Sequence, residues 1–201
     1  MKPSSDTEFG NAWPMLQQEL DIWADSGLSA SFWWRDDDAV AETPQLNRLD
    51  ALSREFDVPI SIAVIPALLD TSLSTFLLHR HRFSVLQHGF GHTSYAEKGV
   101  KKIEIGGERK LDDIRRELAE GYQKLAIAFP SQFVPVLVPP WNRINSNTYE
   151  TLLEIGLLGI STVRARLVSH PRPNLLQINS HLDPINWRHG RGFIGSRLAI
   201  A

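Results

Sequence analysis

The chain has 201 residues, of which 42% are hydrophobic and 22% charged, so its composition and length predict one globular domain over residues 1–201. A formal net charge of −2 leaves little basic surface to neutralise phosphates, so nucleic acid is not an expected partner. The chain has no cysteine, which excludes disulfides and thiolate ligands, and any metal must bind through nitrogen or oxygen.

Apolar residues recur at spacings that predict alternating helices and strands. A helix is expected at about residues 12–25, followed by a strand at 29–35. Thr43 and Pro44 mark the start of a second helix, and the strand after it, at 59–66, is apolar almost throughout. The elements that follow are a helix within 70–81, a strand at 83–87, a loop at 89–107, a helix at 110–129, a strand at 133–138, a helix that begins at 145–146, and strands at 158–163 and 175–180. This alternation predicts a mostly parallel sheet, either open and doubly wound or closed into a barrel.

Polar residues follow the carboxyl ends of four predicted strands. Aspartates 36–38 end the first strand, His88 ends the third, residues 141–143 (Trp-Asn-Arg) follow the fourth, and His181 ends the sixth. In parallel α/β folds, the active site lies at this edge of the sheet. These residues are therefore the candidates for a common functional site.

Two histidines and a run of aspartates point to a metal. His88 and His92 are four residues apart and can bind one divalent cation, and an aspartate of the run can complete the coordination. Neutral imidazole and carboxylate suit Zn²⁺ and other divalent first-row ions, and three protein ligands leave a position for water. Such a metal polarises a carbonyl and makes its water more acidic, which indicates a metallohydrolase.

The three aspartates are expected to have different partners. Side chains alternate along a strand, so Asp36 and Asp38 are expected to face one way and Asp37 the other. One of them can then bind the metal while its neighbour faces the substrate. Like charges this close are best tolerated when a cation or an arginine offsets them.

Four motifs resemble those of the polysaccharide deacetylases, carbohydrate esterase family 4, in order and approximate spacing. They are Asp37-Asp38, His88-x-x-x-His92, Pro139-Pro140-Trp141 and Ile178-x-x-His181. The resemblance spans about residues 30–185 and is strongest to a divergent branch, because the first motif reads Arg-x-Asp-Asp rather than Thr-Phe-Asp-Asp. It implies a distorted (β/α) barrel with about seven strands, and a metal-dependent hydrolase that removes N- or O-acetyl groups from sugars.

The resemblance also implies a role for each matching residue. Asp37 corresponds to the catalytic base, and the metal ligands correspond to Asp38, His88 and His92. Trp141 stands where the family has a tyrosine whose backbone N–H binds the oxyanion, and His181 stands where it has the general acid. A register shifted by one residue, with Asp36 as the base and Asp37 as the ligand, stays an alternative.

The chain also departs from the family pattern. Gly89 replaces the Ser or Thr after the first histidine, and Val138 stands where an arginine pairs with the catalytic aspartate. Arg35 or Arg143 is expected to supply that charge. The motif that orients the acid histidine is missing, and Asp183 is its nearest substitute. The residues expected to contact the substrate or the oxyanion are Arg35, Trp141, Asn142, Arg143 and Trp187.

These patterns predict a metal-dependent deacetylase, with Zn²⁺ as the expected metal and an acetylated sugar as the expected substrate. The alternatives are an amidohydrolase for a smaller amide, a carbohydrate-binding relic without turnover, and a hydrolase of the same branch that works without metal. Residues 1–9 lack the pattern of a signal peptide, and no run of eighteen apolar residues occurs. We therefore expect a cytoplasmic protein without membrane contact. The apolar ending at 197–201 suggests that a further C-terminal element covers it.

Overall fold

The computed structural model describes residues 12–187 and 190–200. Residues 1–9, on which the expectation about a signal peptide depends, and the final residue of the apolar ending lie outside this part. Contacts group the chain into two compact units. The larger unit runs from Trp33 to Ser180, and the smaller combines the described residues up to Phe32 with the described residues from His181 onward. The single domain over 1–201 stays a prediction.

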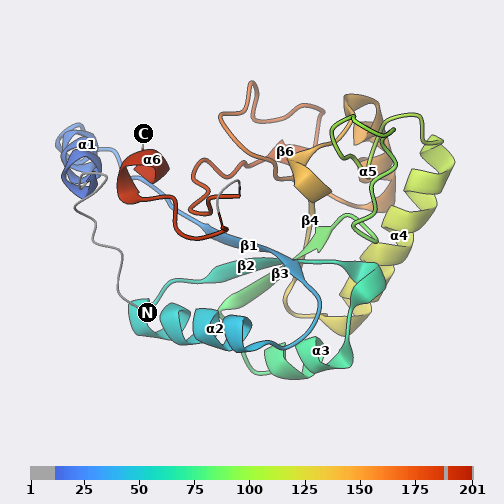
Figure 1. Cartoon of the computed structure of the whole chain (residues 1–201), viewed down its shortest axis with the longest axis horizontal. Coiled ribbons are helices and arrows are strands. Elements are labelled where there is room, and N and C mark those ends of the chain that lie inside the picture. The colour runs from blue at the N-terminus through green and yellow to red at the C-terminus, as the bar shows by residue number, and fades with distance from the viewer. Residues whose placement is uncertain (1–11, 188–189, 201) are drawn as a thin grey trace. The chain divides into compact units, whose positions relative to one another are not determined.

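The larger unit contains a parallel sheet of six strands in chain order (Figure 1). The strands are β1 (Trp34–Ala39), β2 (Ile60–Val64), β3 (Phe83–His88), β4 (Phe133–Val138), β5 (Gly159–Ile160) and β6 (Leu176–Gln177). A doubly wound sheet reverses its strand order at a switch point, whereas a barrel adds each strand beside the previous one. The observed order is that of a barrel, although no pairing among the described residues closes the sheet. The predicted α/β fold of the deacetylase type is confirmed, with six strands where about seven were expected.

Helices and short 3₁₀ turns connect the strands. They are α2 (Pro44–Phe56), α3 (Thr71–Leu77), α4 (Leu111–Ala128) and α5 (Tyr149–Ile155), with 3₁₀ turns η2 (Pro66–Leu68), η3 (Pro140–Asn142) and η4 (Ser146–Thr148). The start of α2 at Pro44 follows from its cap, because the Thr43 hydroxyl accepts a hydrogen bond from the Leu46 amide at 3.1 Å. Gly156 ends α5 in a left-handed conformation, as expected for a helix C-terminus.

Two apolar clusters form the core of this unit. The first joins β2 and β3 to α2, α3 and the end of α4, and its largest fully buried members include Phe83, Phe129 and Leu77. The second joins β4 and β5 to α4 and α5 around Leu137 and Leu152. Because α4 contributes to both clusters, it holds the two halves of the sheet in register. The strand ends that carry the polar residues are therefore fixed by a well-packed core.

The first strand differs from its predicted position at 29–35. It begins at Trp34, which pairs with Ile60 at the start of β2, so earlier residues have no neighbouring strand to bond. It continues through the three aspartates to Ala39. Between Asp36 and Ala39 the strand has one more residue than the matching stretch of β2, which is a β-bulge. The aspartates therefore lie inside a distorted strand, and regular alternation does not continue through them.

The smaller unit contains α1 (Trp13–Asp25) and α6 (Ser196–Ile200). The Ala12 amide donates a hydrogen bond to Ser196 Oγ at 3.4 Å, which joins the two segments of this unit. None of the helices in the described part of the chain is long and apolar enough to cross a membrane.

Candidate metal centre

Three possible metal ligands converge at the carboxyl ends of the first and third strands. Asp38 lies near the end of β1, His88 is the last residue of β3, and His92 follows four residues later in the loop. The Nε2 atoms of His88 and His92 lie 3.0 and 3.2 Å from Asp38 Oδ1, and the ligand atoms of all three residues lie within 4.8 Å of one another. The predicted metal set thus comes together in one place.

His88 is oriented by the backbone of the neighbouring strand. Its Nδ1 lies 2.9 Å from the carbonyl oxygen of Val138, the last residue of β4, and its ring is buried. A carbonyl only accepts hydrogen bonds, so Nδ1 must carry the proton. The lone pair of a neutral ring is then on Nε2, which faces Asp38. A backbone carbonyl of this kind is a common outer partner of a metal-binding histidine.

The three side chains fit a divalent cation such as Zn²⁺. Zinc binds imidazole nitrogen and carboxylate oxygen at about 2.0–2.2 Å, so ligands of a tetrahedral ion lie roughly 3.3 Å apart. The contacts of 3.0 and 3.2 Å around Asp38 are close to that spacing. The close contact with His88 lowers the pKa of Asp38, so this carboxylate stays ionised and available as a ligand.

Four residues of the site have a left-handed backbone. Asp38, His92, Trp141 and Asn142 have φ values of 70°, 54°, 56° and 55°. This conformation costs roughly 1–2 kcal/mol for a residue with a β carbon. Such conformations persist only where the surrounding structure imposes them, and they cluster at functional sites.

Arg35 forms a two-pronged ion pair with Asp37. Its Nε lies 2.9 Å from Asp37 Oδ1, and its NH2 donates to Asp37 Oδ2 at 3.0 Å. Arg35 also donates to Asn142 Oδ1 at 2.9 Å and to Ser161 Oγ at 2.7 Å. Arg143 instead donates to the carbonyl of Lys102. Of the two arginines expected to replace the one missing at Val138, Arg35 is therefore the one that contacts Asp37.

Replacing Arg35 with methionine is expected to lower the free energy of unfolding by about 3 kcal/mol, as for breaking a buried ion pair from one side. The value lies at the lower end of that range because the Asp37 side chain is 28% exposed. Urea unfolding of the variant measures the loss. Arg48→Met, which changes an exposed arginine of α2, is the matched control and is expected to shift the value by less than about 0.5 kcal/mol. Equal shifts in the two variants would contradict a structural role of the pair.

Asp36 differs from Asp37 and Asp38 in that burial dominates its environment. Burial raises its pKa to about 6, and repulsion from Asp37 and Asp38 adds to this effect. Asp36 is thus partly protonated in weakly acidic solution, while Asp38 is held ionised. The three adjacent aspartates therefore differ in their partners, because Asp37 pairs with Arg35 and Asp38 contacts the two histidines.

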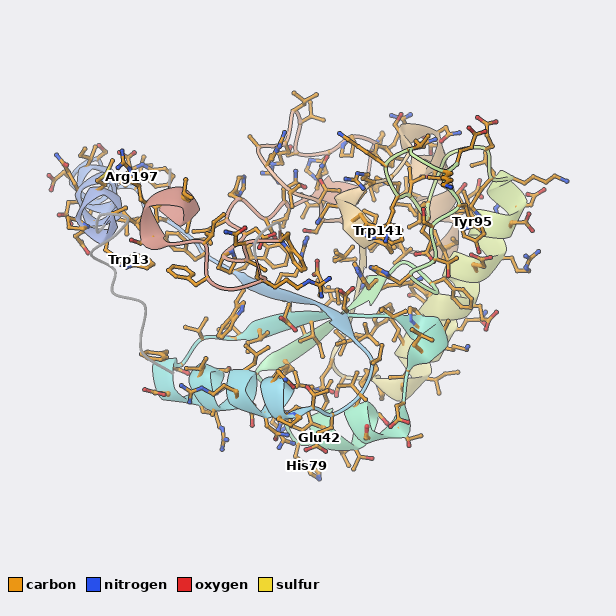
Figure 2. All side chains as sticks on the ribbon, viewed as in Figure 1. Trp13, Glu42, His79, Tyr95, Trp141 and Arg197 are labelled. Carbon is orange, nitrogen blue, oxygen red and sulfur yellow. The ribbon has the colours of Figure 1, made fainter. Side chains whose placement is uncertain are left out.

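Trp141 and Asn142 lie in η3, just beyond the end of β4, where Figure 2 labels Trp141. The Trp141 ring centroid lies 4.5 Å from that of His92, so the indole packs against a candidate ligand. The Asn142 amide donates to the Pro139 carbonyl at 2.8 Å. Among the described residues, no hydrogen bond uses the backbone N–H of Trp141. That group is available to a ligand.

His181 and Trp187 belong to the smaller unit, and both are exposed. Trp187 Nε1 donates to Asp183 Oδ2 at 2.6 Å, and the Ile185 amide donates to Asp183 Oδ1. Within the described part of the chain, Asp183 has no hydrogen bond to His181, the residue it was expected to orient. The acid role of His181 and the substrate role of Trp187 stay predictions.

Two residues of this site were not predicted from the sequence. Ser161 follows β5 and contacts Arg35, and applying the strand-end rule to the fifth strand would have found it if that strand's end had been known. Glu104 is 2% exposed and contacts the loop that carries His92. Nothing in the local pattern around Glu104 distinguishes it from the other charged residues of its loop.

No family model matches the chain, and no curated protein matches it. Solved structures do match, and they identify the fold as that of the polysaccharide deacetylases. IcaB from Ammonifex degensii is 12% identical, with a TM-score of 0.57 over 72% of this chain and 66% of its own. Deacetylase PplD from Streptococcus pyogenes is 15% identical, with a TM-score of 0.54 over 82% of this chain and 70% of its own. The deacetylase domain of BpsB from Bordetella bronchiseptica is 14% identical, with a TM-score of 0.55 over 82% of this chain and 76% of its own. The predicted resemblance is thus confirmed for the fold.

Proposed function

We propose that the chain is a metal-dependent hydrolase that removes an acetyl group from a carbohydrate. The convergence of Asp38, His88 and His92 beside the pair of Arg35 and Asp37 carries this proposal. Support also comes from the fold, whose solved examples include named deacetylases. A divalent cation held by the three ligands would polarise the acyl carbonyl and make water more acidic.

The other residues divide the remaining steps among them. Asp37 accepts the proton of the attacking water, and Arg35 holds its carboxylate in place. The backbone N–H of Trp141 donates to the oxyanion that forms at the carbonyl. His181 donates a proton to the departing amine or alcohol, so the products are acetate and the deacylated sugar. Asn142, Arg143 and Trp187 contact the substrate.

A cleft lies beside the aspartates, and its size fits one sugar unit. It has a volume of about 610 Å³ and is lined by aspartates 36–38 and by residues at the start of α2, among them Thr43 and Arg48. Ligand pockets commonly fall within roughly 300–1,000 Å³, which accommodates a sugar unit. The Asp38 side chain is 57% exposed, so the site is open to a substrate.

Acetate release tests the proposal. Purified full chain, loaded with Zn²⁺, is incubated with N-acetylglucosamine, its oligomers, acetylated xylan and small amides, next to a metal-stripped control. Acetate from a carbohydrate in the loaded sample alone is the expected result. Release from small amides alone would favour the amidohydrolase, and equal release from the stripped sample would favour a hydrolase that needs no metal. Binding of acetylated sugar without any release would overturn catalysis and favour a binding relic.

A further inference from the structure

A buried carboxylate lies beneath the loop that carries His92. Glu104 is 2% exposed and accepts hydrogen bonds from three backbone amides of this loop. The bond from Gly91 to Oε1 is short, at 2.8 Å, and those from Phe90 and Thr93 are longer, at 3.4 and 3.5 Å. These amides flank His92 on both sides. The carboxylate of Glu104 thus serves as the common hydrogen-bond acceptor for these three loop amides.

Gly89 leaves the space that this carboxylate occupies. A β carbon at this position would lie 2.0 Å from Glu104 Oε2 and 2.7 Å from the Pro140 ring, and the φ of Gly89 is +54°. Serine or threonine, which the family pattern has after the first histidine, would collide with the glutamate. The departure at Gly89 and the buried Glu104 are therefore two parts of one arrangement.

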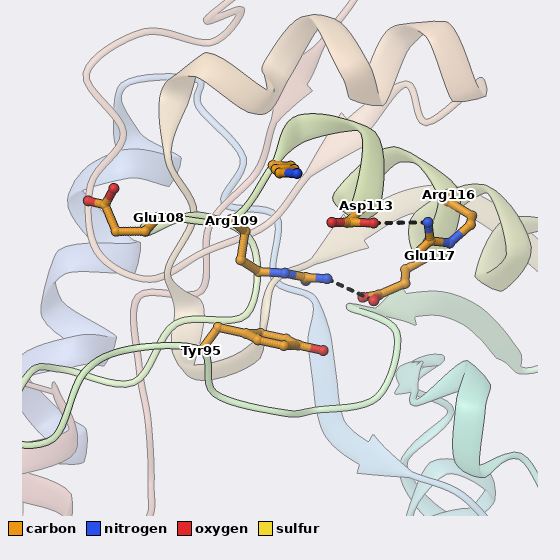
Figure 3. Close-up of a pocket in the computed structure, with 7 residues that line it drawn as sticks. Tyr95, Glu108, Arg109, Asp113, Arg116 and Glu117 are labelled. Carbon is orange, nitrogen blue, oxygen red and sulfur yellow. Dashed lines mark hydrogen bonds and ion pairs between the residues drawn. The ribbon is translucent and has the colours of Figure 1, made fainter.

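Arg109 binds the backbone of Glu104. Figure 3 shows this arginine between Tyr95 and Glu117. Arg109 NH1 donates to the Glu104 carbonyl at 3.0 Å, and NH2 pairs with Glu117 of α4 at 2.7 Å. The Arg109 guanidinium carbon lies 3.8 Å from the Tyr95 ring centroid, and the Tyr95 amide donates to the Ile103 carbonyl. Both halves of the loop are thereby fastened to each other and to a core helix.

We infer that Glu104 is a positioning residue that holds His92 ready for the metal. Burying a carboxylate carries a desolvation cost, and within the described residues no cation pairs with Glu104 to offset it. The three amides offset part of this cost, and they would be left unsatisfied if an apolar side chain replaced the glutamate. The inference rests on the proposed metal site. It adds a residue that acts through the loop and does not touch the metal.

Zinc affinity of Glu104→Gln, measured on the full chain by competition with a chelator, tests this inference. Glutamine keeps the size of the side chain but presents an NH₂ group to one amide, so we expect the affinity to fall about 10–100-fold. The matched control is Glu108→Gln, an exposed glutamate of the same loop, which is expected to bind as the wild type does. Unchanged affinity in Glu104→Gln, or an equal loss in Glu108→Gln, would overturn the inference.

Hydrogen exchange of the metal-free wild-type chain provides a second test that needs no variant. The amides of Phe90, Gly91 and Thr93 are expected to exchange slowly, because Glu104 holds them before any metal binds. Fast exchange at all three would overturn the inference. A wild-type chain that binds no zinc would overturn the metal site instead, a distinct result because every variant would then show none.

Discussion

His92→Ala is expected to reduce bound zinc from about one ion per chain to nearly none. The structure brings only three candidate ligand side chains together among the described residues, so loss of one leaves two, too few for a stable site. Metal content after dialysis without chelator, measured by plasma mass spectrometry, checks this result. Acetate release is expected to fall to the level of the metal-stripped wild type.

The His92 variant is a cleaner test than His88→Ala. The His92 side chain is 25% exposed, whereas that of His88 is 3% exposed and bonded to the Val138 carbonyl, so its removal also leaves a buried gap. His79→Ala, an exposed histidine elsewhere on the chain, is the matched control and is expected to keep its zinc. Full zinc content in the His92 variant would contradict the proposed ligand set.

Asp37→Asn is expected to retain zinc and to lose turnover by about 10²–10⁴-fold, the usual contribution of a general base. Asparagine has nearly the same shape but cannot take a proton from water at neutral pH. The structure pairs Asp37 with Arg35 and places Asp38 beside the histidines, so metal binding is expected to survive. Zinc content and the rate of acetate release, measured on the same sample, separate the two roles.

Asp36→Asn is the variant that distinguishes the two assignments of the aspartates, with either Asp37 or Asp36 as the base. With Asp37 as the base, this variant is expected to keep both zinc and most of its activity, because Asp36 neither pairs with Arg35 nor contacts the histidines. If the Asp37 variant lost its zinc and the Asp36 variant lost its turnover, the shifted assignment would hold, with Asp36 as the base. Unfolding midpoints of both variants show whether a loss arises from misfolding.

Much of the fold could be predicted because its signals are local. Strand 133–138 and the helix at 110–129 were predicted to within a residue, since β-branched runs and three-and-four spacing depend only on neighbours along the chain. The strands expected at 158–163 and 175–180 have only two residues each. In each case the apolar segment is longer than the part that forms hydrogen bonds with a neighbouring strand. The length of that part depends on the neighbouring strand, which the local sequence pattern does not reveal.

The sequence predicted which residues belong to the candidate site better than it predicted which contacts they make. Strand-end position was enough to select His88, Asp38 and Trp141, since parallel strands bring their carboxyl ends to one edge. It could not choose between Arg35 and Arg143 as the partner of Asp37. That choice depends on where each guanidinium reaches in space, and Arg143 reaches the carbonyl of Lys102, between β3 and α4.

Local signals in the chain specify the parallel α/β architecture, the types of the candidate metal ligands and their place near the strand ends. Hydrophobic periodicity, helix caps and motif spacing are encoded locally, so each could be seen in the printed chain. The contact partners of these residues, in contrast, depend on the folded arrangement. The bulge between Asp36 and Ala39 separates Asp37 from Asp38, the Val138 carbonyl turns His88, and Glu104 holds the loop of His92. These contacts join residues that are distant along the chain, and their existence depends on strand register and packing, which no local pattern specifies.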